Sequence, residues 1–195
     1  MAGFTEIRWH GRGGQGAKTA ALLLAEAASE AGLYVQGFPE YGPERMGAPV
    51  LAFNRFSSDP ICLHCHVANP SVVAVLDPTL IKGSSVTAGL RPNGVIVVNT
   101  PEDPARMRRR LGLAHHRDLR VATVDASGIS MKALGQAIPN TPMMGAVIRT
   151  TGLLDFDHFM EVAAALLREK FGRKPSLVDG NLKAIEEAYN QVKEA

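Results

Sequence analysis

A glycine-rich segment near the start of the chain has the residue types and the spacing of an anion-binding loop. Residues 11–16 read Gly-Arg-Gly-Gly-Gln-Gly and satisfy the pattern G-x-G-x-x-G. Glycines in this pattern permit a tight turn and expose backbone N–H groups at the positive end of the following helix, where a phosphate is stabilised. Lys18 would add positive charge. The pattern predicts a loop that faces an anionic ligand or a protein partner, with close packing of strand, turn and helix as the purely structural alternative.

Two classes of nucleotide-binding protein share parts of this pattern. The dinucleotide fingerprint also requires an acidic residue at the end of the second strand, where it binds a ribose hydroxyl. Here the nearest acid, Glu40, comes only after Pro39. A phosphate-binding P-loop requires lysine directly after the last glycine, and Ala17 stands there. A stand-alone nucleotide-binding protein that uses residues 11–16 is therefore an alternative and not the main interpretation.

A second cluster of potentially reactive residues, Cys62-Leu63-His64-Cys65-His66, contains the C-x-x-C-H pattern of c-type haem attachment. Haem attachment of that type requires export, and we expect no signal peptide because no basic segment followed by an apolar one is visible at the N-terminus. On a strand, Cys62, His64 and His66 would share one face, which leaves a zinc site short of its fourth ligand. Small and polar residues on an edge strand are the simpler interpretation, with haem and zinc as alternatives.

A basic run follows in the second half of the chain, formed by Arg106, Arg108, Arg109 and Arg110, with residues 115–117 (His-His-Arg) close behind. A solvated helix face explains such a run, and a docking surface for an acidic, ferredoxin-like protein is the alternative. The chain shows no Ser-His-Asp order with a nucleophile elbow, no H-E-x-x-H pattern and no suggestively spaced carboxylates. We therefore expect neither a self-contained catalytic centre nor a metal site.

The elements that must position these residues follow from hydrophobic periodicity. Strands are expected at residues 5–9, 33–38, 49–56, 61–67, 71–77, 94–100 and 120–125, and helices at 17–31, 78–81, 104–111, 130–137, 143–150, 157–171 and 175–192. The strands from residue 71 onward are apolar on both faces, as strands between two layers of helices are. The alternation predicts an α/β fold with three layers (α/β/α), a mainly parallel mixed sheet and a Rossmann-like first βα unit. A hairpin between residues 49–56 and 61–67 would make the sheet mixed.

Composition limits the class of protein. The chain has 195 residues, of which 46% are hydrophobic and 21% charged, and these are the values of one globular domain. The net charge of +2 is too near neutral to predict a nucleic-acid partner. No apolar stretch approaches 18 residues, so we expect no membrane span and a cytoplasmic location, where the two cysteines would stay thiols.

Three stretches of the sequence resemble a known enzyme family. They are WHGRGGQGAKT (residues 9–19), FPEYGPERMGAPV (residues 38–50) and NTPMMGA (residues 140–146). Together they are similar to the gamma subunits of pyruvate:ferredoxin oxidoreductases, or pyruvate synthases, within the 2-oxoacid:acceptor oxidoreductase family. The resemblance extends from about Thr5 to the C-terminal helices.

The resemblance implies that residues 1–195 form a single gamma-type domain of a complex that converts pyruvate, coenzyme A and oxidised ferredoxin to acetyl-CoA, CO2 and reduced ferredoxin. It implies alpha, beta and delta subunits as partners. The complex uses thiamine diphosphate, Mg and iron–sulfur clusters, none of which this chain would bind alone. Two cysteines agree with this, because a cluster needs four thiolates. Enzymes for 2-oxoglutarate, branched-chain 2-oxoacids or indolepyruvate are the alternatives within the family.

By the same resemblance, residues 11–16 and 40–47 are the loops on the active-site side. Both follow the carboxyl ends of predicted strands, where open α/β sheets bind their ligands. We expect Lys18 and Arg45 to meet phosphates of coenzyme A, while Tyr41 and Glu44 hold the second loop in place. The candidate residues facing a ligand or partner are Gly11, Arg12, Gly13, Gly14, Gln15, Gly16, Lys18, Tyr41, Glu44 and Arg45.

Overall fold

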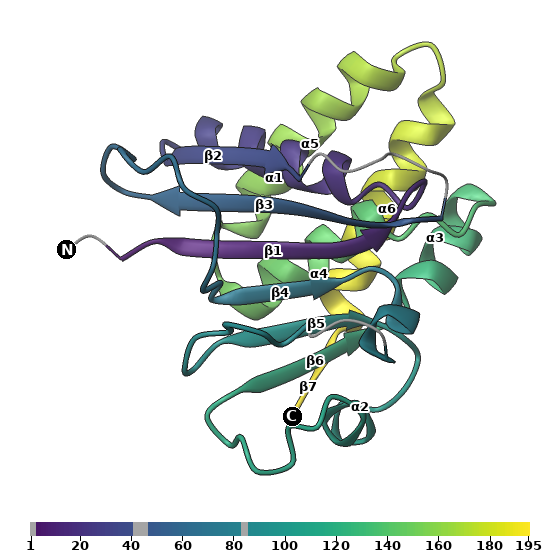
Figure 1. The fold of residues 1–195 in the computed structure, drawn as a ribbon. Coiled ribbons are helices and arrows are strands. Elements are labelled where there is room, and N and C mark those ends of the chain that lie inside the picture. Colours follow the sequence, from purple (N-terminus) through teal and green to yellow (C-terminus); the bar gives the residue numbers. More distant parts are fainter. Residues whose placement is uncertain (1–2, 41–46, 83–85) are drawn as a thin grey trace.

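A mixed β-sheet forms the centre of the structure, a computed structural model that describes residues 3–40, 47–82 and 86–195 (Figure 1). Its strands lie in the order β2-β3-β1-β4-β5-β6-β7. Strands β1, β4, β5 and β6 run parallel, whereas β3 lies antiparallel between β1 and β2, and β7 is antiparallel to β6. The strands are β1 (Thr5–Arg12), β2 (Tyr34–Pro39), β3 (Pro49–Ser57), β4 (Val72–Val75), β5 (Val95–Asn99), β6 (Arg120–Val124) and β7 (Lys193–Glu194).

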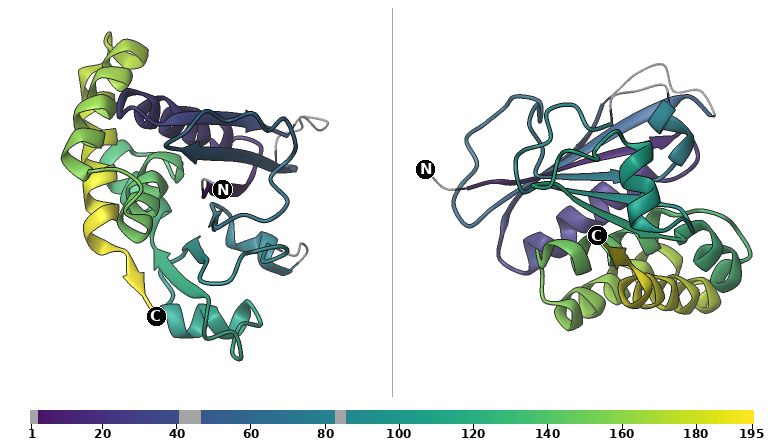
Figure 2. Two further views of the ribbon diagram at one scale, coloured as in Figure 1. Left: turned by 90° about the vertical axis from the view of Figure 1, so that its left-hand side faces the viewer. Right: turned by 90° about the horizontal axis from the view of Figure 1, so that it is seen from below.

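The helices cover the two faces of this sheet unequally (Figure 2). One face carries the long helices α1, α4, α5 and α6 together with α3, whereas the other carries η1, α2 and irregular segments. The bounds are α1 (Ala17–Glu30), the 3-10 helix η1 (Pro78–Lys82), α2 (Pro104–Arg110), α3 (Ala126–Leu134), α4 (Asn140–Thr151), α5 (Phe156–Phe171) and α6 (Pro175–Gln191). The predicted α/β class with a mainly parallel mixed sheet is confirmed, with a thin third layer.

Side-chain alternation along the central strands creates a separate core on each face. Val72 and Ala74 of β4 point to the long helices, while Val73 and Val75 point to the side of η1 and α2. All four are at most 3% exposed. Both faces of β4 are therefore apolar because both are covered, which is the reason its sequence lacks a polar alternation.

The first strand and the first helix are joined through a buried polar bridge. Trp9 of β1 is fully buried, and its indole Nε1 donates to Oδ1 of Asn54 on β3 at 2.8 Å. Asn54 in turn donates through Nδ2 to the carbonyl of Ala21 on α1, also at 2.8 Å. This bridge fixes α1 against the sheet, so the loop between β1 and α1 has a defined geometry at both ends.

The expected strand at residues 61–67, and with it the hairpin, is wrong. Strand β3 pairs with β2 along one side and β1 along the other, so no side of β3 is left for a hairpin partner. The carbonyls of this segment instead accept side-chain hydrogen bonds, Leu63 from Gln36 Nε2 at 2.8 Å and Cys65 from Arg55 at 3.2 Å. The sheet is mixed because of β3 and β7.

The residues that the structure describes include no helix long and apolar enough to cross a membrane.

Candidate functional site

The glycine loop connects β1 to α1 at the point where the sheet changes direction. From β1 the chain continues through α1 to β2 and β3 on one side, and then crosses to β4 on the other side of β1. Open α/β sheets bind ligands at such a switch point, outside the carboxyl ends of the strands. The predicted position of residues 11–16 at the carboxyl end of the first strand is confirmed, although Gly11 and Arg12 still belong to β1.

Backbone contacts tie the glycine loop to the entrance of β3. The N–H of Gly13 donates to the carbonyl of Ala48 at 2.9 Å, and the N–H of Gly47 donates to the carbonyl of Gly13 at 3.2 Å. Residues 11–16 therefore lie beside the end of the second predicted loop. Of the site residues expected in that second loop, Tyr41, Glu44 and Arg45 lie outside the described residues.

A carboxylate at the end of β4 holds the glycine loop in place. The Oδ2 atom of Asp77 accepts from Arg12 Nε at 3.1 Å and from Gln15 Nε2 at 2.9 Å. The Oδ1 atom accepts from the backbone N–H and the hydroxyl of Thr79, at 2.9 and 2.6 Å. Burial alone would raise the pKa of Asp77, but the hydrogen bonds from Thr79 and Gln15 and the charge of Arg12 outweigh it and lower the pKa. Asp77 is therefore an ionised anchor.

Two of the predicted site residues, Arg12 and Gln15, donate hydrogen bonds directly to the Asp77 carboxylate. Besides Asp77, the guanidinium of Arg12 donates to the carbonyl of Gly47 at 2.9 Å and to the hydroxyl of Thr79 at 3.0 Å. Oε1 of Gln15 accepts from the backbone N–H of Arg12 at 2.7 Å. The side chain of Arg12 is 34% exposed, so its outer surface reaches solvent while its donors are directed at the protein. Both residues shape the loop from within.

The last glycine of the loop meets the start of α4. Gly16 directly precedes α1 as its N-cap residue and has a φ of +79°, and a Cβ there would lie 2.7 Å from Nδ2 and 2.9 Å from Cβ of Asn140. Position 16 thus needs glycine for its backbone and for its contact with Asn140. Neither α1 nor α4 has a side chain that caps its N-terminus. Two helix ends with positive partial charge therefore meet behind the loop, and exposed Lys18 lies in the first turn of α1.

The site also contains Asp77, Thr79 and Asn140, which are not among the site residues predicted from the sequence. Asp77 carried a usable signal, because it follows an apolar run that predicts a buried strand. Asn140 begins one of the three stretches that carry the family resemblance, but nothing in the sequence brings it to Gly16. That contact depends on the packing of α4 beside α1 and β4.

Strand β1 also presents a row of polar side chains to the thinly covered face of the sheet. Arg8 donates from Nε to Nε2 of His10 at 2.9 Å and from its terminal nitrogen to the carbonyls of Val86 and Ala88. Burial, together with the charge of Arg8, lowers the pKa of His10 to about 4, so this imidazole is neutral at pH 7. A neutral imidazole that accepts a hydrogen bond is a structural partner of Arg8.

Two residues before Arg8, on the same face of β1, Glu6 pairs with Arg55 at 2.8 Å and also with Arg91. Both oxygens of this buried carboxylate are thereby used, and Arg55 additionally donates to Oε1 of Gln36. This charged row connects β1, β3 and β2 beneath the segment that contains the two cysteines.

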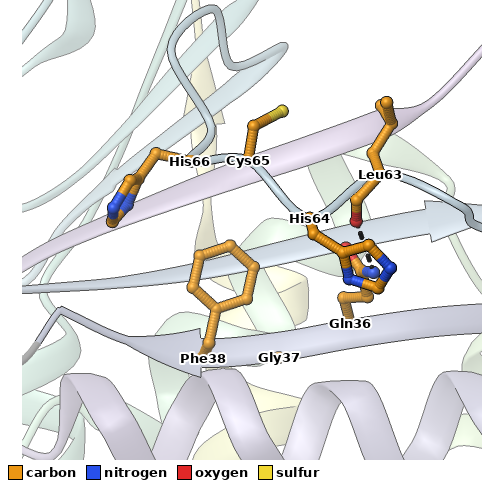
Figure 3. A pocket seen from close by; sticks show the side chains of 7 residues that line it. All are labelled: Gln36, Gly37, Phe38, Leu63, His64, Cys65 and His66. Atoms are coloured by element: carbon orange, nitrogen blue, oxygen red, sulfur yellow. Dashed lines mark hydrogen bonds between the residues drawn. The ribbon is translucent and has the colours of Figure 1, made fainter.

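The Cys-His segment lines a cavity of about 420 Å³ against β2, together with Gln36, Gly37 and Phe38 (Figure 3). Figure 3 shows the imidazole of His64 beside Gln36, that of His66 on the other side of Phe38, and the thiol of Cys65 directed away from the cavity. Both cysteines are free and exposed. In the described part of the chain no three potential ligands come together as a metal site. Because residues 61–67 form no strand, the expected shared face of Cys62, His64 and His66 does not exist.

The arginines of the basic run on α2 bind different partners within the chain. Arg106 and Arg110 both pair with Glu102. Arg108 donates to the carbonyls of His116, Leu119 and Ala195, and so holds the C-terminus against β6. The expected solvated helix face therefore also has an internal anchoring role.

The fold agrees with comparisons to known proteins. The family model described as pyruvate ferredoxin/flavodoxin oxidoreductase matches residues 6–191. Pyruvate synthase subunit PorC of Thermotoga maritima is 43% identical over 97% of this chain and 95% of its own. The pyruvate/ketoisovalerate oxidoreductases common subunit gamma of Thermococcus kodakarensis is 44% identical over 95% of this chain and 96% of its own. A crystal structure of the pyruvate oxidoreductase subunit PORC (EC 1.2.7.1) from Thermotoga maritima covers 98% of both chains, with 41% identity and a TM-score of 0.84.

Proposed function

The chain belongs to the pyruvate ferredoxin/flavodoxin oxidoreductase family, and we propose that it is the gamma subunit of a 2-oxoacid:ferredoxin oxidoreductase whose substrate is pyruvate. The complex would convert pyruvate, coenzyme A and oxidised ferredoxin to acetyl-CoA, CO2 and reduced ferredoxin. The observation that carries this proposal is the similarity to PorC over nearly the full length of both chains. Because the relative from Thermococcus is named for two substrates, pyruvate and ketoisovalerate, the choice of 2-oxoacid would rest with other subunits.

Within the complex, we assign this chain a role in assembly and in the approach of coenzyme A. The proposed ligand-facing surface consists of residues 11–16, Lys18 and the loop that contains Tyr41, Glu44 and Arg45. Support comes from the two uncapped helix ends at Gly16 and Asn140, because backbone N–H groups there favour a phosphate. The anchor at Asp77 would keep the loop rigid, so that a phosphate binds without the cost of ordering it.

Substitution of Arg45 tests the contact with coenzyme A. In the assembled oxidoreductase, Arg45→Ala and Lys18→Ala should each raise the KM for coenzyme A about tenfold, with a smaller effect on the KM for pyruvate. Arg117→Ala, which removes an exposed arginine from the segment after α2, serves as the control. An unchanged KM for coenzyme A in both variants would remove the phosphate contacts and leave the subunit assignment standing.

The proposed partners are alpha, beta and delta subunits, with ferredoxin as the electron acceptor. Thiamine diphosphate, Mg and the iron–sulfur clusters would be held by those subunits. Purification of the native chain from its own cells should co-purify a thiamine-dependent subunit and a ferredoxin-like subunit. Calorimetry of the isolated chain separates the alternative, because tight binding of NAD, FAD or ATP would indicate a stand-alone nucleotide-binding protein. We further propose a cytoplasmic location, where a reducing environment keeps exposed Cys62 and Cys65 as thiols.

A further inference from the structure

The cavity between β2 and residues 63–66 lies one strand away from the part of the sheet that leads into the glycine loop, because β3 separates β2 from β1. Its volume of about 420 Å³ falls within the range of about 300–1,000 Å³ that pockets for small molecules have. Among the described residues, the contacts that hold the glycine loop do not involve those that line this cavity. The cavity is therefore large enough for a ligand of its own.

An aromatic ring forms the floor of this cavity. Figure 3 shows the ring of Phe38 face-on, with the imidazole of His64 to one side of it and the imidazole of His66 to the other. The ring is only half-buried, and Phe53, which is 3% exposed, packs against it with 5.5 Å between the ring centroids. A second flat ring stacks favourably on such a platform, in an offset arrangement with centroids about 4.5–7 Å apart.

Hydrogen-bonding groups lie at the edges of this platform. His64 and His66 are exposed, and within the described part of the chain neither imidazole makes a hydrogen bond. A neutral imidazole has one donor and one acceptor, so each can bond to a ligand in either sense. The amide of Gln36 accepts from Arg55 and donates to the carbonyl of Leu63, each at 2.8 Å, and retains one lone pair and one N–H. Three side chains therefore offer unused hydrogen-bonding groups around the ring.

Buried contacts hold the walls of the cavity in place. Arg55 is 1% exposed, and it donates to Oε1 of Gln36 and to the carbonyl of Cys65, at 2.8 and 3.2 Å. Its charge is balanced by Glu6, whose carboxylate lies 2.8 Å from Nε. Because Gln36 also donates to the carbonyl of Leu63, residues 63–66 are fastened to both β2 and β3. Walls that are fixed before a ligand arrives reduce the entropy that binding costs.

We propose that this cavity binds a flat heteroaromatic ring, the class of molecule to which the bases of nucleosides belong. The ring stacks on Phe38, and the nitrogen atoms and polar substituents at its edge bond to His64, His66 and Gln36. A carbocyclic ring of the same size would stack as well but would cover these polar groups without giving them partners, which costs affinity. The proposal adds a binding site to the subunit function proposed above and does not depend on it.

A metal ion fits the cavity less well than a flat ring. The imidazoles of His64 and His66 lie on opposite sides of Phe38, and the thiol of Cys65 points away from the cavity (Figure 3). These side chains therefore do not converge on one point, as the ligands of a zinc ion do. In the part of the chain that the structure describes, no three potential ligands come together as a metal site. Two imidazoles that flank an aromatic ring instead suit the two edges of a molecule stacked on it.

Titration of the full chain with adenosine, followed by NMR spectroscopy, tests this site. The purine has a flat face and ring nitrogens at its edge, and a Kd of about 0.1–1 mM is expected for a ligand of this size. The imidazole resonances of His64 and His66 should shift during the titration, whereas that of His115, which is exposed after α2, should not. Benzyl alcohol, which stacks but has no ring nitrogen, should bind at least about tenfold more weakly.

Two variants and a matched control locate the binding. Phe38→Ala should raise the Kd of adenosine about tenfold, because it removes the stacking platform. His64→Ala, at an exposed position outside both apolar cores, should raise the Kd about threefold through the loss of one hydrogen bond. His115→Ala removes an exposed imidazole from the segment after α2 and should leave the Kd unchanged.

Three results would overturn the proposal. The first is the absence of imidazole shifts at adenosine concentrations well above the expected Kd. The second is a Kd that neither Phe38→Ala nor His64→Ala changes, because the nucleoside would then bind elsewhere on the chain. The third is equal affinity for benzyl alcohol, which would remove the heteroaromatic class. The subunit assignment rests on the similarity to PorC, so it survives each of these results.

Discussion

Replacement of Asp77 by asparagine removes the anchor of the glycine loop while keeping the size of the side chain. The asparagine oxygen can still accept the hydrogen bonds from Thr79, but its amide group would face the donors of Arg12 and Gln15. Two hydrogen bonds to a carboxylate that is 11% exposed are thereby lost. Each lost hydrogen bond should cost only about 1 kcal/mol, because Arg12 can turn to solvent. The expected loss in the free energy of unfolding is therefore about 2 kcal/mol at pH 7.

The pH dependence of this loss separates an ionic anchor from simple packing. The pKa of Asp77 is lowered in the folded chain, so its charge stabilises the fold fully above the unfolded pKa of about 3.9. This contribution declines as the pH falls below that value and is lost once the pH has passed through the lowered pKa of the folded state. The difference between wild type and Asp77→Asn should therefore be largest near pH 7 and shrink below about pH 4.

Urea unfolding of the two chains at a series of pH values measures this difference. Asp118→Asn is the matched control, because Asp118 is an exposed carboxylate of the segment between α2 and β6, and it should change the free energy of unfolding by less than about 0.5 kcal/mol. The same loss at pH 7 and at pH 3, or no loss at pH 7, would refute an ionised anchor at the end of β4.

Two further predictions concern the surroundings of the loop. Gly16→Ala should lower the free energy of unfolding by about 1–2 kcal/mol, because alanine is strained in the left-handed backbone conformation of residue 16. The contact of the new Cβ with Asn140 should add a further loss. In an Asn140→Gly background only the backbone cost remains, so urea unfolding of the four chains should give a coupling free energy of about 1 kcal/mol, and additive losses would contradict the contact. The lowered pKa of His10, about 4 in the folded chain against 6.5, means that stability is lost as the pH falls from about 6.5 to 4, by about 3 kcal/mol in total. His10→Gln, which can still accept from Arg8, should show no such decline in the same pH series, and equal declines would contradict a buried neutral imidazole.

The first βα unit was predictable because its signals are local. Gly11–Gly16 stands between an alternating segment and a helical one, and each of these patterns lies within a few residues of the turn it defines. Apolar runs with a polar end likewise located β4, β5 and β6 within about two residues. Strand β1 was predicted at residues 5–9 but extends to Arg12. Glycine weakens a strand pattern, and the last residues of β1 are held in the strand by pairing with β3.

The position of β3 could not be read from local pattern. Residues 49–57 are equally suited to a hairpin with the segment after them and to a place between β2 and β1. The choice depends on contacts far along the chain: Asn54 with Trp9, and Arg55 with Glu6. Once β3 lies between β2 and β1, residues 61–67 cannot pair with it, and the alternating Cys and His residues no longer share one face of a strand.

The same long-range packing explains why the polar side chains of the glycine loop bond to neighbouring parts of the protein and hold the loop in place. Arg12 and Gln15 look like ligand-binding residues in the sequence, yet their polar atoms are directed at Asp77, Thr79 and Gly47. A loop fixed in this way holds the uncapped N-terminal ends of α1 and α4 in one geometry, and helix ends of this kind favour a phosphate. The described residues of this loop therefore form a rigid, positively polarised edge, as the proposed approach of a phosphate of coenzyme A requires.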